Sequence, residues 1–319
     1  MASHPHTFIP VAMKHLRWIC LFFLTMAAVL PVQGQETGLN FLRIGANASA
    51  SAMGDAQVAS SRDAFSTYWN PAGLARASSN SASFSHRIWI GDLRTYDVAA
   101  RFGVGRKGGL GLAITATDSG DLEAREVPGD PEGFFSAQFI SIGLSYGRQI
   151  GPLHIGVTAK YLSEQIFENE ATGYAFDAGV QLGVLRDLVH VGAAIQNLGK
   201  MSKLERVATE LPRTLRAGVV LFPFHIIAED DGTALLDVML AMEVSHLFPG
   251  EITRLHAGLG LTVLDLIVAR AGFITNDELR DFTFGAGLHV ETLIFDYAYL
   301  PFEGGFEGPG HVLTLMYAW

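Results

Sequence analysis

Apolar and polar side chains alternate along the chain from about Ser81 to its last residue. The pattern is clear in residues 96–104, 153–161, 174–184 and 282–291, where one face is apolar and the other carries Gly, Thr, His and charged residues. Successive side chains of a β-strand point to opposite faces, so a period of two residues predicts strands. The fold class predicted from this pattern is all-β.

The length of the alternating segments favours a membrane protein. They run over about 9–13 residues, whereas soluble strands most often have about 5–6 and membrane strands need about 9–11. Mean hydropathy is +0.27, and charged residues make up only 17%, against roughly 25% in soluble domains. Past residue 35 the sequence holds no uncharged apolar stretch of about 18 residues, the length that a spanning helix needs. A closed antiparallel β-barrel, which satisfies every backbone group in lipid, is therefore predicted.

Counting the alternating segments predicts a barrel of 14 strands, an even number as single-chain bacterial barrels have. The predicted strands are residues 81–90, 95–104, 109–118, 137–149, 153–165, 172–184, 188–197, 212–222, 234–246, 253–263, 265–275, 280–290, 292–300 and 311–319. The longer joins, 119–136 and 199–211, are typical of extracellular loops, with both ends of the barrel on the periplasmic side.

The N-terminus has the features of a secretory signal. Lys14 and Arg17 precede an apolar segment at residues 18–30, and small residues near Gly34 suit cleavage. We therefore predict a signal peptide at residues 1–34, with a retained signal anchor as the alternative, and a location in the bacterial outer membrane. The single Cys20 lies in this segment, so the exported chain has no thiol for disulfides or for Cys-based zinc sites.

The C-terminal strand alternates and ends on an aromatic residue. Leu313, Leu315, Tyr317 and Trp319 share one face, and aromatic rings favour the membrane interface. The pattern looks like the C-terminal signal, with Tyr317 and Trp319, that outer-membrane proteins present to the barrel assembly machinery. That machinery and the lipid of the outer membrane are the partners that the barrel itself implies.

Residues 35–80 differ from the rest of the chain. They are rich in Ala, Ser and Gly and show no period of two, yet they include Phe41, Met53, Tyr68 and Trp69. This content is too apolar for a disordered tail. We predict an N-terminal hatch that packs in or under the barrel at residues 81–319, with a periplasmic extension as the alternative.

Motifs for catalysis or metal binding are weak. Gly143, Ser145 and Gly147 match a nucleophile-elbow pattern, but they lie inside an alternating segment rather than between a strand and a helix. The formal charge of -10, with 22 scattered Lys and Arg residues, argues against nucleic acid. We predict no enzyme activity, no cofactor and no metal.

Polar residues of the barrel are predicted to face the lumen. His side chains there could line a metal path, but solvated lumen residues are the favoured interpretation of His154, His190, His256 and His289. Charges of both signs are expected to pair across a narrow lumen, stabilising and occluding it. The predicted charged set is Asp97, Arg101, Lys160, Asp177, Arg216, Arg254 and Arg270, together with Asp237, Glu243, Glu291 and Asp296.

Two N-terminal segments, residues 41–59 and 63–75, resemble the signature of the PorV/PorQ family of outer-membrane proteins. The family looks related to FadL-type transporters, which share an Asn-Pro-Ala-Gly-like element. Residues 173–179, 196–199 and 210–212 look similar to later family segments. The residues that match the hatch motif are Gly45, Met53, Gly54, Asp55, Tyr68, Trp69, Asn70, Pro71, Ala72 and Gly73.

This resemblance implies a 14-stranded barrel with an N-terminal hatch, associated with type IX protein secretion. PorV-like members bind or shuttle cargo that bears a C-terminal sorting domain, and PorQ-like members belong to the attachment machinery, so secretion components or such cargo are the implied partners. Two alternatives stay open, a FadL-like channel for hydrophobic small molecules and a soluble periplasmic β-protein.

Overall fold

The computed structural model describes residues 39–91, 93–124, 131–185, 188–204, 206–227, 234–303 and 308–319. The predicted signal peptide lies outside these ranges. None of the helices within them is long and apolar enough to cross a membrane.

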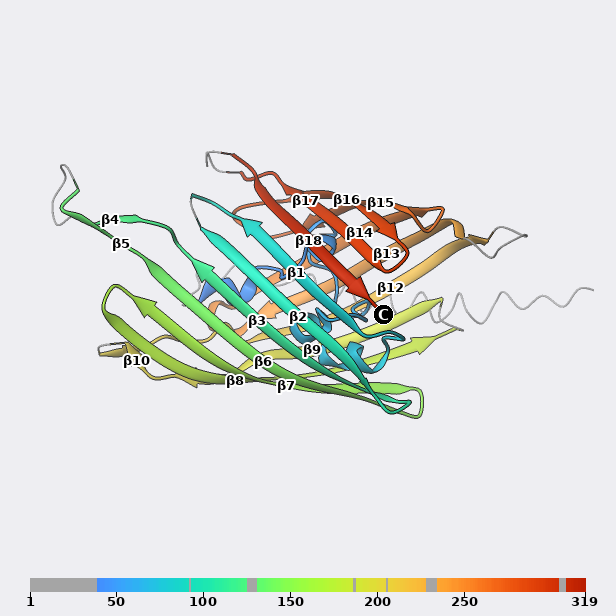
Figure 1. Cartoon of the computed structure of the whole chain (residues 1–319), viewed down its shortest axis with the longest axis horizontal. Helices are drawn as coiled ribbons and strands as arrows, with labels where there is room; N and C mark the ends of the chain where they lie inside the picture. The colour runs from blue at the N-terminus through green and yellow to red at the C-terminus, as the bar shows by residue number, and fades with distance from the viewer. Residues whose placement is uncertain are drawn as a thin grey trace, which may run out of the picture. The chain divides into compact units, whose positions relative to one another are not determined.

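Fourteen antiparallel strands close into a barrel (Figure 1), which confirms the predicted fold class. Each wall strand pairs with the wall strands before and after it in the sequence, and the pairing of β1 with β18 closes the barrel. Four short strands, β4, β5, β10 and β11, do not belong to the wall. The wall strands are β1 (Ser81–Ile88), β2 (Arg94–Val104), β3 (Gly108–Asp118), β6 (Ala137–Ile150), β7 (Leu153–Ile166), β8 (Asn169–Val184), β9 (Val189–Met201), β12 (Thr214–Ile227), β13 (Ala234–Leu247), β14 (Ile252–Val263), β15 (Ile267–Ile274), β16 (Phe282–Val290), β17 (Leu293–Leu300) and β18 (Gly310–Ala318).

Two strands run well past their predicted ends. In β9 the alternation breaks at Asn197, which has a φ of 60° beside a register shift between Phe176 and Ala178 of β8. In β12 the pairing shifts between Leu221 and Phe224. A bulge adds one residue and reverses the alternation, so a period-two reading stops there although the strand continues.

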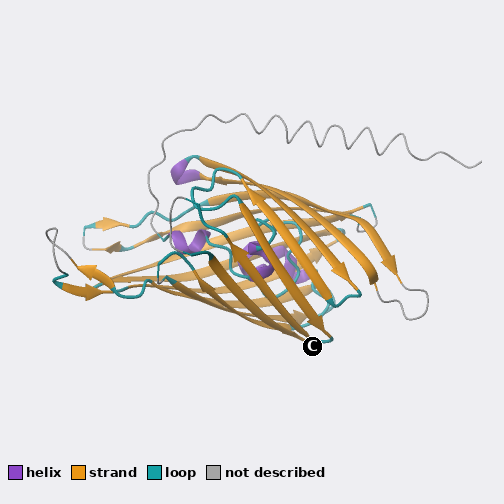
Figure 2. Ribbon diagram, turned by 90° about the horizontal axis from the view of Figure 1, so that it is seen from above, coloured by secondary structure: helices purple, strands orange, loops and turns teal. Residues whose placement is uncertain are grey.

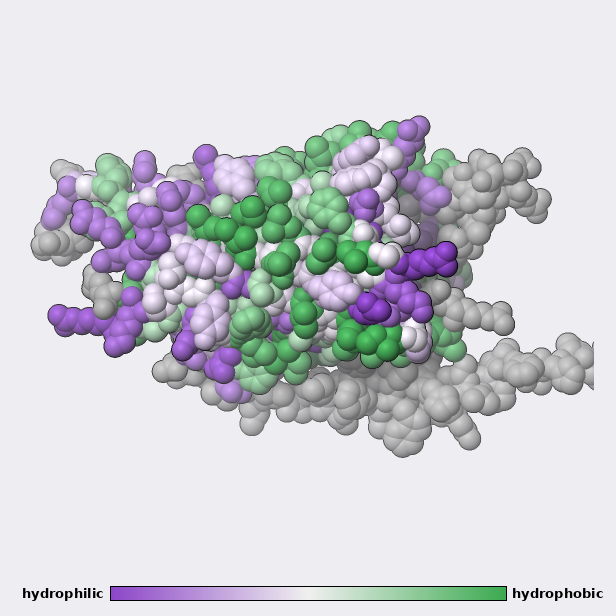
Figure 3. All heavy atoms as spheres, turned by 60° about the horizontal axis from the view of Figure 1, so that its bottom comes forward, coloured by the Kyte–Doolittle hydropathy of each residue, from purple (hydrophilic) through white to green (hydrophobic). Residues whose placement is uncertain are grey.

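The two faces of the wall differ as lipid and lumen require. Outward side chains such as Val98, Leu144 and Leu313 are apolar and exposed, whereas Ser83, Asp97 and other polar inward residues are buried. Figure 3 shows apolar side chains gathered over the middle of the wall and polar ones towards its ends. The chain therefore contacts membrane lipid over this band.

The two ends of the barrel carry joins of different length. At the end that holds Trp319, strands are joined by short turns such as residues 105–107 and 151–152, and Asn80 pairs through its backbone with Trp319 at 3.0 Å in both directions. The joins at the other end include residues 119–136 and 202–213. Because such barrels have short periplasmic turns and longer outer loops, the second end is the outer one.

Two small ribbons extend the outer end. One is formed by β4 (Leu122–Ala124) with β5 (Gly133–Phe135), and the other by β10 (Lys203–Leu204) with β11 (Val207–Ala208). Both ribbons fall within joins that the sequence predicts to be outer loops. Their strands have only two or three residues each, which is too short for an alternating pattern to be recognised.

Residues 39–80 lie inside the barrel and form the hatch. They contain short helices, η1 (Asn40–Arg43), α2 (Ala48–Ser51), α3 (Ser66–Trp69) and η2 (Pro71–Ala75), which Figure 2 shows enclosed by strands. A fifth short helix in the described residues, η3 (Phe248–Gly250), belongs to the join between β13 and β14. Apolar contacts attach the hatch to the wall, for example Met53, Val58 and Ala59 against Ala194 and Val220.

Candidate functional site in the lumen

Asn70 attaches the hatch to the wall through its side chain. Its Nδ2 donates to the carbonyl oxygens of Val58 at 2.8 Å, Val180 at 3.0 Å and Ala193 at 3.3 Å. Its Oδ1 accepts from the backbone N–H of Ala72 at 3.1 Å and so caps η2. One fully buried amide therefore joins two parts of the hatch to β8 and β9.

Pro71 to Leu74 pack directly on glycines of the wall. A Cβ added to Gly156 would lie 2.2 Å from the carbonyl carbon of Pro71, and one on Gly147 would lie 2.7 Å from the Pro71 oxygen. A Cβ on Gly109 would lie 2.2 Å from the Leu74 oxygen. Backbone can approach backbone this closely only where no side chain intervenes. These wall glycines therefore allow the hatch backbone to reach the wall.

The Gly-x-Ser-x-Gly pattern belongs to this attachment and not to a nucleophile elbow. Its residues lie within β6, and Ser145 shares a hydrogen bond of 2.8 Å with the hydroxyl of Thr158 on β7. Gly147 is one of the glycines beneath Pro71. The strand–turn–helix context of a hydrolase is absent here.

Tyr68 and Trp69 fix the path of the hatch upstream of η2. The Tyr68 hydroxyl lies 3.0 Å from the carbonyl oxygen of Leu42 and 2.7 Å from that of Ile44. Trp69 Nε1 donates to Asn47 Oδ1 at 2.8 Å. A Cβ on Gly45 would lie 3.0 Å from the Trp69 ring, so glycine leaves room for the indole.

Asp55 is the ionic centre of the hatch. It is buried, has a φ of 62°, and forms an ion pair with Arg280 from the join between β15 and β16. Burial acts to raise the pKa of its carboxyl group, but the guanidinium groups of Arg280 and Arg216 outweigh burial and hold that pKa below its usual value. Asp55 is thus held ionised inside the lumen.

A second buried pair supports the same part of the hatch. Arg216 of β12 pairs with Glu243 of β13, and Glu243 Oε2 also accepts from the backbone N–H of Val58 at 2.8 Å. The Arg216 guanidinium lies 4.9 Å from the centre of the Trp69 ring. This pair therefore joins both strands to the hatch.

Met53 and Gly54 lie against β14, β15 and β16. Gly54 has a φ of +64°, and an added Cβ would lie 2.9 Å from the carbonyl oxygen of Phe273. Its N–H donates to Thr283 Oγ1 at 3.1 Å, and its carbonyl lies 2.7 Å from His256 Nδ1. Side chains of the wall thus provide hydrogen-bond partners for the backbone N–H and carbonyl groups of this turn.

Most of the remaining predicted lumen charges bond to groups of the wall, of the hatch or of an outer join. Lys160 lies 2.7 Å from Asp177, and Arg270 lies 2.6 Å from Asp296. Arg101 donates to three hatch carbonyls, those of Leu74, Ala77 and Ser79. Asp97 accepts from Thr115 at 2.7 Å, and Arg254 lies 3.9 Å from Asp277.

These contacts correct the prediction that charges pair across a narrow lumen. The hatch occupies that space, so the partners come from neighbouring strands or from the hatch itself. Glu291 does not face the lumen, because it lies exposed in the turn between β16 and β17 with a φ of 50°.

Two of the four His residues on the polar face are also not solvated as predicted. His256 is buried against Ser245 and Gly54, and His190 is buried beside Arg76. In the described parts of the chain, no group of three or more His, Cys, Asp or Glu could hold a metal ion.

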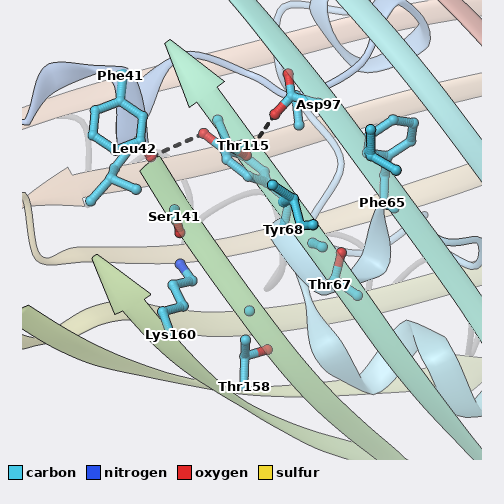
Figure 4. Close-up of a pocket in the computed structure, with 16 residues that line it drawn as sticks. Phe41, Leu42, Phe65, Thr67, Tyr68, Asp97, Thr115, Ser141, Thr158 and Lys160 are labelled. Atoms are coloured by element: carbon cyan, nitrogen blue, oxygen red, sulfur yellow. Dashed lines mark hydrogen bonds between the residues drawn. The ribbon is translucent and has the colours of Figure 1, made fainter. Parts of the chain in front are cut away.

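A small cavity of about 20 Å³ lies between the hatch and the β2, β3, β6 and β7 wall (Figure 4). The hatch contributes Phe41, Leu42 and Phe65, and the wall contributes polar groups that include Asp97 and Lys160. This volume is close to the space that one water molecule needs.

At the outer end, an apolar cap covers α2. The rings of Trp89 and Phe302 meet edge to face at 4.8 Å and pack in one cluster with Ala48 and Ala52. Arg280 lies 5.2 Å from the Trp89 ring. Trp89, Arg280 and Thr283 fall within predicted strands, but the alternation does not show that they contact the hatch.

The C-terminal aromatic residues lie on the lipid face. Tyr317 and Trp319 stack with ring centres 5.5 Å apart, and Trp319 meets Phe102 edge to face at 6.3 Å. Both are about half exposed, as expected for aromatic residues at the periplasmic interface between membrane and water.

Comparison with known proteins agrees with this architecture. A family model described as "Type IX secretion system protein PorV" matches residues 32–93. No curated protein matches the chain.

Three solved barrels share the fold. The toluene transporter TbuX of Ralstonia pickettii is 13% identical, with 86% of this chain and 98% of that chain covered and a TM-score of 0.58. The monoaromatic hydrocarbon channel CymD is 12% identical, covering 89% and 98%, with a TM-score of 0.57. A FadL homologue of Pseudomonas aeruginosa is 11% identical, covering 90% and 99%, with a TM-score of 0.55.

At such low identity the solved structures show the fold alone. The family match adds the hatch segment, which contains Asp55 and the Tyr68 to Gly73 motif. The chain is therefore a β-barrel of the bacterial outer membrane with the fold of these solved barrels, and its residues 32–93 are similar to the PorV family.

Proposed function

We propose that the chain is a non-enzymatic, partner-binding barrel that takes part in type IX protein secretion, where it binds or shuttles cargo with a C-terminal sorting domain. The family match over residues 32–93 carries this proposal. The matched segment includes residues 39–80, which form the hatch.

The attachment of the hatch supports a binding role over a conducting one. Its backbone lies against wall glycines such as Gly156, and Asp55 and Glu243 hold it through buried charges. Breaking one buried ion pair costs about 3–5 kcal/mol. The cavity of about 20 Å³ beside the hatch holds little more than one water molecule.

We also propose the route by which the chain reaches its place. Residues 1–34 direct export and are removed, and the strand that ends in Tyr317 and Trp319 is presented to the barrel assembly machinery. Mass spectrometry of the mature N-terminus tests the cleavage site after Gly34.

Deletion of the gene tests the secretion role. The expected result is retention of sorting-domain cargo in the cells, with secretion restored by the wild-type gene, and recovery of secretion components with the affinity-purified barrel. Normal cargo release by the deletion strain rejects the proposal.

A second candidate is uptake of hydrophobic small molecules. The apolar hatch side chains Phe41, Leu42 and Phe65 on one side of the cavity favour it. Two of the solved barrels with this fold, a toluene transporter and a monoaromatic hydrocarbon channel, also favour it. Uptake of a labelled monoaromatic hydrocarbon that falls in the deletion strain, while cargo release stays normal, would support this candidate over secretion.

A further inference from the structure

The lipid-facing side of β7 and β8 changes character part of the way along. Up to Tyr161 and Tyr174, which pair across the two strands and are about half exposed, the outward residues are apolar. Beyond them the outward residues of both strands are polar, namely Ser163, Gln165, Glu170 and Thr172. Tyrosine is typical of the membrane–water interface, so this pair marks where the strands leave the lipid.

The lumen side of these strands is largely apolar at the same level, with the exception of the buried Glu164, which accepts from Thr209 Oγ1 at 2.6 Å. Leu162 and Ala171 are buried there, and they pack in one apolar cluster with Leu39 and Phe41 of the hatch. A polar outside over an apolar inside is the pattern of a water-soluble sheet. The outer ends of β7 and β8 are therefore exposed to water and, together with the β4–β5 and β10–β11 ribbons, form an extension of the barrel.

This extension stands well above the membrane. Phe167, in the turn after β7, is six residues beyond Tyr161. At about 3.3 Å per residue and a tilt of roughly 40°, the distance is about 15 Å. Figure 3 shows polar side chains gathered at the end where Figure 1 places β4, β5 and β10.

Two phenylalanines stand exposed on this extension. Phe134 of β5 and Phe167 are each 63% exposed. The Phe167 N–H donates to the carbonyl oxygen of Ser136 at 3.3 Å, two residues along from Phe134. Exposed aromatic groups outside lipid are typical of protein–protein contact sites.

The charges around these rings are acidic. Exposed carboxylates accompany the two rings on the β4–β5 ribbon and the β7–β8 turn, namely Asp121, Glu132, Glu168 and Glu170. Residues 125–130 lie outside the described ranges and carry one basic and two acidic side chains. Exposed basic residues of the extension include Lys200, Lys203 and Arg206, on β9 and the β10–β11 ribbon, and the Lys200 ammonium lies 5.9 Å from the centre of the Tyr174 ring. An anionic lipopolysaccharide layer would be repelled by the acidic half.

We propose that Phe134 and Phe167, with Asp121, Glu132, Glu168 and Glu170, form an outer aromatic patch that docks a folded protein outside the membrane. The partner presents an apolar surface ringed by Lys and Arg. This inference deepens the proposed function by naming the surface that a secretion partner would contact.

Site-specific photocrosslinking in intact cells tests the patch. A benzoylphenylalanine replaces Phe134 or Phe167, and Phe224 serves as the control because it is 61% exposed near the inner end of β12. We expect one discrete protein adduct from each patch position and none of that mass from Phe224. Adducts with lipopolysaccharide alone, or no adduct from either position, would overturn the proposal.

Charge reversal supplies the second arm. Glu132→Lys with Glu168→Lys is expected to lower the adduct yield about fivefold or more, because like charges would then face the basic partner. Glu278→Lys with Glu303→Lys, exposed at the outer end outside the patch, should leave the yield unchanged. An equal yield from both double variants contradicts a basic partner.

Cargo release separates this inference from the proposed function. If the deletion strain retains cargo, while neither benzoylphenylalanine position gives an adduct and Phe134→Ser with Phe167→Ser secretes normally, the patch is wrong and the secretion role stands. If the adduct forms but the deletion strain secretes normally, the secretion role is wrong and the docking surface stands.

Discussion

The hatch is held at two places by different physical means. In the Asn70 region (residues 70–74), backbone meets wall glycines, and an uncharged amide makes the hydrogen bonds. In the Asp55 region (residues 53–58), buried ion pairs to Arg280 and between Arg216 and Glu243 dominate. Shape holds the first region and charge the second, so the two should respond differently to added volume, lost charge and pH.

Added volume in the Asn70 region should have the largest effect. In Gly156→Val, the new side chain would occupy the position of the Pro71 backbone. Overpacking costs about 1–3 kcal/mol where neighbouring side chains can move aside, and here the obstacle is backbone, so we expect a larger cost. We expect the barrel to fail to close around the hatch in most molecules of this variant. The measurement is heat-modifiable migration on gels, which those molecules should lose. The matched control is Gly143→Ala, whose added Cβ meets nothing nearer than 3.5 Å; equal assembly of the two would refute the glycine contact.

Loss of charge in the Asp55 region should come next. Glu243→Ala leaves Arg216 buried without its carboxylate and the Val58 N–H without its acceptor. The expected loss of unfolding free energy is about 3–5 kcal/mol, measured by guanidinium unfolding in lipid or detergent. Exposed Glu278→Ala should change it by less than about 0.5 kcal/mol, and an equally small change for Glu243→Ala would show that the pair does not hold the hatch.

Loss of the uncharged amide should have a smaller effect. Asn70→Ala removes donors to three carbonyl groups and the cap of η2, for which about 1–3 kcal/mol is expected. Its stability should change with pH in the same way as that of the wild type. A different acid response in Asn70→Ala would mean that the two regions are electrostatically coupled.

Acid should weaken only the Asp55 region. Since the pKa of Asp55 lies below its usual value of 3.8 in the folded protein, its contribution is fully present above that value and is lost as pH falls through the lowered pKa. We expect wild-type unfolding free energy to fall below about pH 4 more steeply than that of Asp55→Asn. Parallel pH profiles of the two proteins would contradict this assignment.

The alternation made most of the barrel predictable. Each lipid-facing strand must present apolar residues at every second position, so β1, β2 and β16 were located to within two residues of their observed bounds. The prediction was least accurate where a bulge reverses the period, at Asn197 and after Leu221. It was also silent on β4, β5, β10 and β11, which are too short to show a period.

The candidate site was less predictable than the wall. The hatch motif identified Asp55 and the Tyr68 to Gly73 string, but no pattern in the sequence names their partners. Thr283, Glu243 and Arg280 lie between 185 and 229 residues away from the hatch residues that they bond. Only closure of the barrel brings them together.

The sequence by itself determined that this chain spans the membrane as strands, because lipid imposes its preference at every second residue and the signal is local. The tertiary structure decided what the polar face does. Hatch and wall compete with water for the same hydrogen-bonding groups, and those groups meet only once the barrel has closed around residues 39–80. The lumen charges, predicted to pair across a narrow lumen, instead bond to groups of the wall and of the irregular segment that fills the barrel.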